Sequence, residues 1–429
     1  MNDNFNIKLP WRKLDNSAKI FPIISNKKFS TIFRLSVLLK EEINLIILKK
    51  ALDITLNKFI SFKVKLKKGF FWYYLESNTK DPIIEAENNY PCKYIDKNIN
   101  NGYLFKVTYF NNKINLDVFH SLTDGNSAIR FFKELIYNYI ELIYPNNFKS
   151  SYRDKDCVIK NNTEDSYLKN YDKMLSGRKS SRKAYILVGN KLPLYAIAVT
   201  HGFINLEQLK KVCKEKEVTI TQYLTTVLIH AIYNGNYIKN KSKKPIKVCI
   251  PINLKNYFNS ETITNFFSYI TVEASGDKNQ FKDFSKLLEF TKNDFESRLT
   301  KHEVIRTMSS NVKLGNNIFV RLIPLFIKNI TIKMSYIEIR KYTTTTFSNI
   351  GRISMMPEYK KYVESFLLLL APEKAEKIKC SACSYEKNLI LTFTSILKDS
   401  SIERTFFDFL IKQGIEVKIK SNGVKDAIS

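Results

Sequence analysis

The sequence predicts a mixed α/β protein built from two lobes. Its 429 residues exceed the length at which one hydrophobic core normally stops growing, so two domains are expected. Strand-like and helix-like segments occur in both halves without strict alternation, which indicates a mixed sheet in each lobe. Residues from 146 to about 191 are polar and loop-forming, rich in Lys, Asn, Asp, Ser and Tyr. We therefore divide the chain into a lobe of residues 1–170, a linker of 171–193 and a lobe of 194–429.

The first half predicts two helices and five strands. Residues 41–59 carry apolar side chains at near-helical spacing, and residues 126–144 carry a core-facing apolar stripe that stops before Pro145. Both segments are therefore expected to be helical. The predicted strands span residues 31–38, 62–66, 70–75, 103–110 and 113–120.

The second half of the chain is also predicted to contain both strands and helices. Strands are expected over residues 194–200, 246–251 and 342–347, and a hairpin over 378–397. Helices are expected over residues 206–216, 220–233, 281–298, 357–370 and 401–413. The stretch that ends near residue 332 shows a mixed pattern and predicts no single element.

The chain is strongly basic, with 69 Lys and Arg against 41 Asp and Glu and a formal net charge of +28. Such a balance raises nucleic acid, acidic lipid or a phosphorylated small molecule as partners. However, the lysines are spread over the whole length, and no zinc-finger spacing, basic arm or RNA-binding signature appears. The abundance of Asn, Ile and Lys together is what an AT-rich coding sequence produces. We therefore expect no nucleic-acid partner.

The cysteines and the apolar runs indicate a cytoplasmic protein. Six cysteines in a chain of this length do not form a disulfide scaffold. Cys380 and Cys383 form a lone CxxC, and in a strand their side chains would point to opposite faces, where they cannot share a metal. The first twenty residues lack a signal-peptide pattern, and no fully apolar run exceeds residues 366–371. We expect reduced thiols, no transmembrane segment and no metal.

His120 is the candidate for chemistry among the four histidines. It ends a predicted strand on the same face as three apolar residues, and Asp124-Gly125 then forms a turn before a helix. A side chain at that position can project into a cleft, and an imidazole can remove a hydroxyl or amine proton near neutral pH. On the residues alone, a structural imidazole beside a turn is the commoner interpretation.

The neighbouring residues have simpler expected roles. Asp124 is placed to hold the turn by pairing with an arginine or with backbone amides, and Gly125 is expected to permit a backbone conformation that other residues resist. The histidines His201, His230 and His302 have no partner at a meaningful spacing, so we expect them to be structural or on the surface.

The six residues from His120 to Gly125, HSLTDG, resemble the HxxxDG motif of the CoA-dependent acyltransferase superfamily. This superfamily includes chloramphenicol acetyltransferase, plant alcohol acyltransferases and the condensation domains of non-ribosomal peptide synthesis. The resemblance extends over nearly the whole chain and is closest to the stand-alone bacterial alcohol O-acetyltransferase-like branch. The segments that carry it are residues 11–23, 48–76, 251–270 and 345–353. One departure is Ser61 in the sequence FISF, where relatives often have a proline.

The resemblance implies two similar chloramphenicol-acetyltransferase-like lobes that meet at an active-site tunnel with His120 at the junction. His120 would act as the general base, without a metal or a covalent acyl-enzyme, while Asp124 and Gly125 would be structural. Residues that match a Ser-Asn-x-Gly segment beside the tunnel would position the oxyanion or the acceptor, or would simply end a strand. These residues are Ser348, Asn349 and Gly351. Asn253 and Asn265 follow the same logic, with turn capping as the alternative.

The resemblance also implies the substrates. The leading hypothesis is transfer of an acyl group, acetyl in the first instance, from acyl-CoA as co-substrate to a small-molecule alcohol. The alternatives are transfer from an acyl carrier protein to an amine or hydroxyl, and a non-catalytic relative that only binds a ligand. Because two lobes in one chain can complete a site, a monomer is expected.

Overall fold

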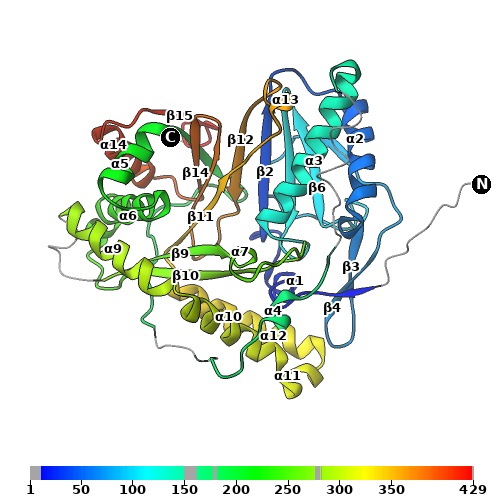
Figure 1. The fold of residues 1–429 in the computed structure, drawn as a ribbon. Helices are drawn as coiled ribbons and strands as arrows, with labels where there is room; N and C mark the ends of the chain where they lie inside the picture. The colour runs from blue at the N-terminus through cyan, green and yellow to red at the C-terminus, as the bar shows by residue number, and fades with distance from the viewer. Residues whose placement is uncertain are drawn as a thin grey trace, which may run out of the picture.

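The computed structural model describes residues 11–148, 162–175, 177, 181–275, 281 and 283–427. Two large sheets stand side by side, each with helices on its outer side, and a smaller sheet lies below the first (Figure 1). Both large sheets contain parallel and antiparallel pairs. The predicted mixed α/β architecture with two lobes is confirmed.

The sheet of the first lobe has five strands, and two antiparallel helices cover it. Helix α2 (Leu45–Lys58) begins at Asn44, whose side chain accepts from two backbone amides, and α3 (Gly125–Ile143) begins at Asp124, whose side chain accepts from the Ser127 amide. Both helices pack their apolar stripes on the sheet. The strand order is β12 (Val363–Leu370), β2 (Ile32–Leu39), β7 (Lys113–Phe119), β6 (Phe105–Phe110) and β5 (Ile84–Ala86).

A small sheet extends this lobe downward. Its order is β1 (Arg12–Lys13), β4 (Tyr73–Ser77) and β3 (Val64–Lys68). Strands β3 and β4 form a hairpin, and the short helix α1 (Phe21–Ile24) follows β1. The N-terminal segment thereby returns to the edge of the first lobe, close to the end of β7.

The sheet of the second lobe has seven strands. Its order is β10 (Phe267–Ala274), β9 (Ile246–Asn253), β11 (Thr345–Arg352), β13 (Ile378–Tyr385), β14 (Asn388–Ser395), β8 (Ala198–Asn205) and β15 (Val417–Ser421). Its core lies against α5 (Leu206–Glu215), α6 (Ile220–Ile232), α9 (Phe284–Arg298) and α14 (Ser401–Lys412). Helix α6 opens with a reciprocal cap between Thr219 and Gln222.

Three further helices run along the lower side of the molecule (Figure 1). They are α10 (Lys301–Asn316), α11 (Ile318–Leu322) and α12 (Leu325–Ile339). Together with α4 (Ser166–Lys169) and α7 (Lys255–Phe258), α10 encloses a small third core around Phe266 and Met308. These helices occupy much of the stretch for which the sequence predicted no single element.

The predicted helix over residues 357–370 is wrong. Only α13 (Pro357–Lys360) is helical, and Val363–Leu370 form β12, an edge strand paired antiparallel with β2. Its run of Phe and Leu is buried on both faces, and periodicity cannot separate such a strand from a buried helix. A strand from the second half of the sequence therefore completes the sheet of the first lobe.

Strand β12 also joins the two lobes through side chains of the second sheet. Three side chains of the second sheet donate to backbone carbonyls of β12. The Ser381 hydroxyl donates to Leu368 at 2.6 Å, and the Cys383 thiol donates to Phe366 at 3.3 Å. The Thr394 hydroxyl donates to Leu370 at 2.6 Å. The boundaries at residues 170 and 194 stay a prediction, and part of the expected linker lies outside the described residues.

Two strands begin later than expected, and the predicted orientation of two cysteines is confirmed. The strand expected at 194–200 begins only at Ala198, and the one expected at 342–347 begins at Thr345. Cys380 and Cys383 do face opposite sides of β13, one in each lobe's core. Five cysteines are free and no cluster of potential metal ligands occurs in the part of the chain that the structure describes. Within that part, no helix has the length and apolarity to cross a membrane.

Candidate active site

His120 lies directly after β7, surrounded by aromatic rings from three separate elements. Its backbone amide donates to Thr31 at 3.2 Å, which continues the sheet one residue past the strand. The imidazole lies 4.6 Å from the ring of Phe33 on β2, stacks on Phe21 of α1 at 5.0 Å and faces Phe267 of β10 at 6.1 Å. These rings belong to both lobes, so the position of the imidazole depends on how the lobes pack.

Burial keeps this imidazole neutral. The pKa of His120 is lowered to about 4, chiefly by burial and also by the positive charge of Lys379, against the opposing effects of Asp124, Asn265 and Glu373. At neutral pH, therefore, a ring nitrogen carries a lone pair that can accept a proton. The residue as a whole is only half-buried, but its Nδ1 atom is fully covered.

Asn265 holds the backbone beside this histidine. Its Nδ2 atom donates to the carbonyl oxygen of His120 at 2.9 Å and to Asp15 at 3.0 Å. Among the described residues, neither Asn265 Oδ1 nor His120 Nδ1 has a geometrically complete hydrogen bond, yet the Asn265 side chain raises the pKa of His120 as a hydrogen-bond partner. These two atoms are therefore the candidates for a hydrogen bond between the two side chains.

Asp15 anchors Asn265 from the N-terminal segment. This buried carboxylate accepts the backbone amide and the carboxamide of Asn265, and its other oxygen accepts the amide of Ala18 at 2.8 Å. Burial raises the pKa of Asp15 to about 6. Asp15 was not predicted from the sequence. Its sequence signal was an acidic residue directly after Leu14, in the segment from 11 to 23 that carried the family resemblance.

Asp124 joins the two lobes next to His120. One oxygen accepts the amide of Ser127 at 3.0 Å and so caps α3, and the other accepts the amide of Phe266 at 3.1 Å. The ammonium group of Lys255 lies 2.8 Å from this carboxylate and also donates to the Ser127 hydroxyl at 2.7 Å. The expected backbone amides are present, but the side-chain partner is a lysine rather than an arginine.

Gly125 does not need the special conformation that was expected of it. It is the first residue of α3, and its φ angle lies outside the left-handed region. A Cβ atom there would lie 3.7 Å from Cγ2 of Ile350, an ordinary contact. The expectation assumed a tight turn at Asp124-Gly125, whereas the capping carboxylate starts the helix directly. At this position α3 lies close to β11.

The Ser-Asn-x-Gly segment lies on β11 with its side chains on two sides. Asn349 Nδ2 donates to Thr221 of α6 at 3.1 Å, and its Oδ1 accepts the amide of Gly351, whose φ is +76°. Ser348 alternates with it along the strand and shares a face with Ile350, which packs on the core of the first lobe. Ser348 therefore faces the first lobe, while Asn349 is engaged with the second.

Asn253 is the cross-strand partner of Phe267, whose ring faces His120. It ends β9, and its Oδ1 accepts the amide of Lys255 at 3.1 Å, so it shapes the turn that carries Lys255 to Asp124. The β9–β10 connection, which Figure 1 shows reaching below β2, thus brings Asn265 and Lys255 to the first lobe.

A buried ion cluster provides the charge near His120, and it was not predicted. Lys379 on β13 contacts Glu373 at 2.8 Å and Glu376 at 3.8 Å. Glu373 also accepts from Tyr336 of α12, and its pKa is lowered chiefly by Lys379, against the effect of burial. The acidic partners hold Lys379 charged, and that charge helps to keep His120 neutral.

The other three histidines have local contacts. His201 shares a 2.8 Å hydrogen bond with Thr392 on the neighbouring strand, and His230 packs against Phe284 and Phe409. His302 is mostly exposed beside Glu303. These contacts agree with the structural and surface roles expected of them.

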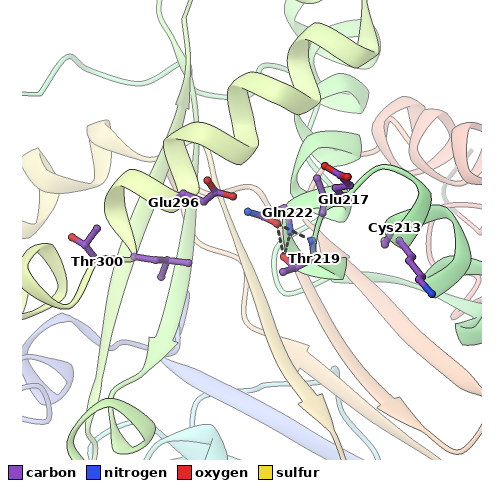
Figure 2. Close-up of a pocket in the computed structure, with 9 residues that line it drawn as sticks. Cys213, Glu217, Thr219, Gln222, Glu296 and Thr300 are labelled. Atoms are coloured by element: carbon purple, nitrogen blue, oxygen red, sulfur yellow. Dashed lines mark hydrogen bonds between the residues drawn. The ribbon is translucent and has the colours of Figure 1, made fainter.

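A separate cavity lies on the second lobe (Figure 2). It has a volume of about 690 Å³ and lies between the α5–α6 turn and the end of α9, with Glu217, Gln222 and Glu296 in its lining. His120, Asn265 and Ser348 do not line it. This cavity is therefore distinct from the histidine site.

The fold matches solved structures, although neither a family model nor a curated protein matches the sequence. The Fusarium sporotrichioides protein TRI101, solved with coenzyme A and T-2, superposes with a TM-score of 0.61 at 10% identity, covering 96% of this chain and 100% of its own. The TRI3 trichothecene 15-O-acetyltransferase of the same species superposes with a TM-score of 0.59 at 10% sequence identity, covering 94% of each chain. The first condensation domain of the CDA synthetase superposes with a TM-score of 0.59 at 10% identity, covering 95% of this chain and 96% of its own.

These similarities extend over essentially whole chains. They confirm that this protein has the two-lobed fold that acetyltransferases and condensation domains share. At such low identity they concern the fold, and the chemistry has to be argued from the site itself.

Proposed function

We propose that this protein is an acyltransferase that moves an acyl group, in the first instance acetyl, from a CoA thioester to the hydroxyl of a small-molecule alcohol. The observation that carries the proposal is His120. It is a neutral imidazole between the two lobes with a pKa of about 4, and it is held at its backbone by Asn265. The solved structure of a protein of this fold with coenzyme A supports the choice of donor.

In the proposed reaction His120 is the general base. If Asn265 Oδ1 accepts the Nδ1 proton, Nε2 is left to take the proton of the acceptor hydroxyl. The hydroxyl oxygen then attacks the thioester carbonyl, and a tetrahedral intermediate forms. Its collapse breaks the carbon–sulfur bond, and the CoA thiolate takes the proton back from the imidazolium. No covalent acyl-enzyme is needed, and proton and charge balance over the cycle.

Other residues have supporting roles in this proposal. Ser348 is the candidate donor to the oxyanion because it lies on the face of β11 directed to the first lobe, whereas the Asn349 carboxamide is already engaged by Thr221. Asp15 is a positioning residue that acts through Asn265. Asp124 and Lys255 hold the β9–β10 connection against α3.

The test is to incubate the purified protein with acetyl-CoA and a panel of alcohols and to measure CoA and ester by chromatography. We expect His120→Ala to lose roughly 10²–10⁴-fold in rate, while the matched surface variant His302→Ala keeps the parent rate. Ser348→Ala is expected to lower kcat by about 10²-fold with little change in KM. Circular dichroism would verify that each variant is folded. Equal rates for the parent and His120→Ala would refute the role of the base.

A second candidate is transfer from a phosphopantetheinyl carrier protein to an amine or hydroxyl. The match to a condensation domain over 95% of this chain favours it. The same assay distinguishes the two donors when the acetyl group is presented once on free CoA and once on a carrier protein. Product from the carrier-bound thioester alone would assign the second candidate. Tight ligand binding with no product from either donor would instead indicate a non-catalytic relative.

A further inference from the structure

Helices α11 and α12 present a row of large apolar side chains to solvent. On α12, Phe326, Ile330, Met334 and Ile337 follow one another at intervals of four, four and three residues, so they form one stripe along the helix. Each is at least 60% exposed, and Ile318 and Leu322 of α11 are exposed to a similar degree. Single exposed apolar residues are ordinary, but a continuous row of this size marks an interaction surface.

The tip of the β3–β4 hairpin adds two aromatic rings to this row. Phe70 is 70% exposed and packs edge-on against Phe71 at 4.8 Å. The amide of Leu325, the first residue of α12, donates to the Phe70 carbonyl at 2.8 Å, and the buried Lys328 donates to the Phe71 carbonyl at 3.0 Å. The hairpin tip is therefore fixed to α12.

We call these eight residues the lower apolar face, after the end of the molecule at which α11, α12 and the hairpin lie in Figure 1. They are Phe70, Phe71, Ile318, Leu322, Phe326, Ile330, Met334 and Ile337.

Exposed basic side chains lie on the same helices and beside the hairpin tip. Residues 301–339, which form α10 to α12, contain six Lys and Arg but only two acidic residues. Arg321 and Lys333 are exposed within the row, Lys313 is exposed on α10, and Lys67 and Lys68 are exposed beside the hairpin tip. An exposed apolar surface with Lys and Arg beside it suits contact with an anionic bilayer, because the apolar side chains can enter the interface while the basic groups meet the lipid phosphates.

We propose that the lower apolar face docks on an anionic lipid membrane. The apolar side chains enter the boundary between headgroups and acyl chains, and the basic side chains contact the lipid phosphates. A second copy of this chain fits less well, because a twofold interface would bring the same basic groups of both copies together. This proposal stands on the surface alone and is independent of the reaction.

Docking there would bring the candidate active site close to the membrane. Helix α12 packs against α1, whose Phe21 stacks on the His120 ring at 5.0 Å. Tyr336 of α12 also donates to Glu373 in the buried ion cluster at 2.7 Å. Helix α12 therefore contacts elements that themselves lie against His120 or carry the charge near it.

The experiment is flotation of the full chain with vesicles of phosphatidylcholine and phosphatidylserine, and with vesicles of phosphatidylcholine alone. We expect binding to the anionic vesicles that weakens with salt. Phe326→Ser combined with Ile330→Ser should lower the partition coefficient by more than about tenfold. The control, Ile411→Ser combined with Ile419→Ser, removes two equally apolar but less exposed side chains from the second lobe, and it should bind like the parent.

Further variants measure the contribution of charge to vesicle binding separately from that of apolar contact. Arg321→Gln and Lys333→Gln should each lower binding to anionic vesicles by about fivefold. Failure to float with either vesicle, or binding that Phe326→Ser with Ile330→Ser leaves unchanged, would overturn the proposal. If the parent instead forms a dimer by light scattering and the same pair of substitutions abolishes it, the face is an interface between copies of this chain.

Discussion

Replacement of Asp124 by alanine should destabilise the protein by breaking the link between its lobes. The carboxylate of Asp124 caps α3 through the Ser127 amide, accepts the Phe266 amide across the lobe boundary at 3.1 Å and pairs with Lys255 at 2.8 Å. The side chains of Asp124 and Lys255 are only 6% and 11% exposed. None of these three contacts can be replaced by water without opening the structure.

The magnitude follows from those contacts. Loss of an N-cap costs about 1 kcal/mol. A buried amide left without an acceptor costs about 1–3 kcal/mol. Removing one partner of a buried ion pair costs about 3–5 kcal/mol, because the remaining charge is uncompensated. Since these terms overlap, we expect about 4 kcal/mol in total for Asp124→Ala, which for a chain of this length lowers Tm by about 4–5 °C.

The assay is thermal unfolding followed by circular dichroism at one fixed scan rate. Lys255→Met should also be destabilising, because it leaves Asp124 without its cation. The double variant should be more stable than the sum of the single effects predicts, by about 2 kcal/mol, since it removes both charges. The matched control is Lys169→Met, which breaks an exposed ion pair with Glu164 and should cost less than about 0.5 kcal/mol.

Two results would refute this reasoning. If the single effects of Asp124→Ala and Lys255→Met add to within about 0.5 kcal/mol, the two side chains are not energetically coupled. If Lys169→Met is as costly as Lys255→Met, loss of any lysine is destabilising in so basic a chain and the lobe contact is not the cause.

Other predictions concern pH and backbone space. The pKa of His120 is lowered to about 4 from a usual value near 6.5, so its contribution to stability is complete above pH 6.5 and is lost as the pH falls toward 4. Unfolding free energies measured over that range should fall by about 3 kcal/mol more in the parent than in His120→Ala, and parallel curves would contradict this. Gly125→Ala should leave Tm within about 2 °C of the parent, since the new methyl group would meet Ile350 at an ordinary 3.7 Å; a larger loss would mean that the glycine conformation matters after all. Gly202→Ala should be the opposite case, because its Cβ would lie 2.2 Å from the Phe407 ring, and we expect a loss of at least about 1–3 kcal/mol in chemical denaturation; unchanged stability would show that the ring moves aside freely.

Local pattern in the sequence was sufficient for the elements around His120. Alternation from residue 113 to 118 predicted β7, and the apolar stripe of residues 126–144 predicted α3, although a turn was expected where Asp124 caps the helix. These patterns depend on side chains that are near neighbours in the chain, where the strand and helix periods hold in any fold. For the same reason the opposite orientations of Cys380 and Cys383 on β13 followed from their spacing.

The partners of those elements could not be found in this way. Asp15 contacts Asn265 across 250 positions in the sequence, Lys255 meets Asp124 across 131, and β12 leaves its own lobe to pair with β2. An apolar run such as that of β12 fits a buried helix and a buried strand equally well. It forms a strand because one edge of β2 would otherwise have no hydrogen-bonded neighbour in the sheet.

Local sequence pattern determines the direction in which a side chain points, but the packing of distant segments determines which residues it contacts. His120 is therefore recognisable as a candidate base from its own strand and turn. Its low pKa, its backbone anchor at Asn265 and the nearby charge of Lys379 exist only because the two lobes close around it. The exposure of the apolar residues on α12 is likewise a tertiary property, since whether an apolar stripe is core or surface depends on what packs against it.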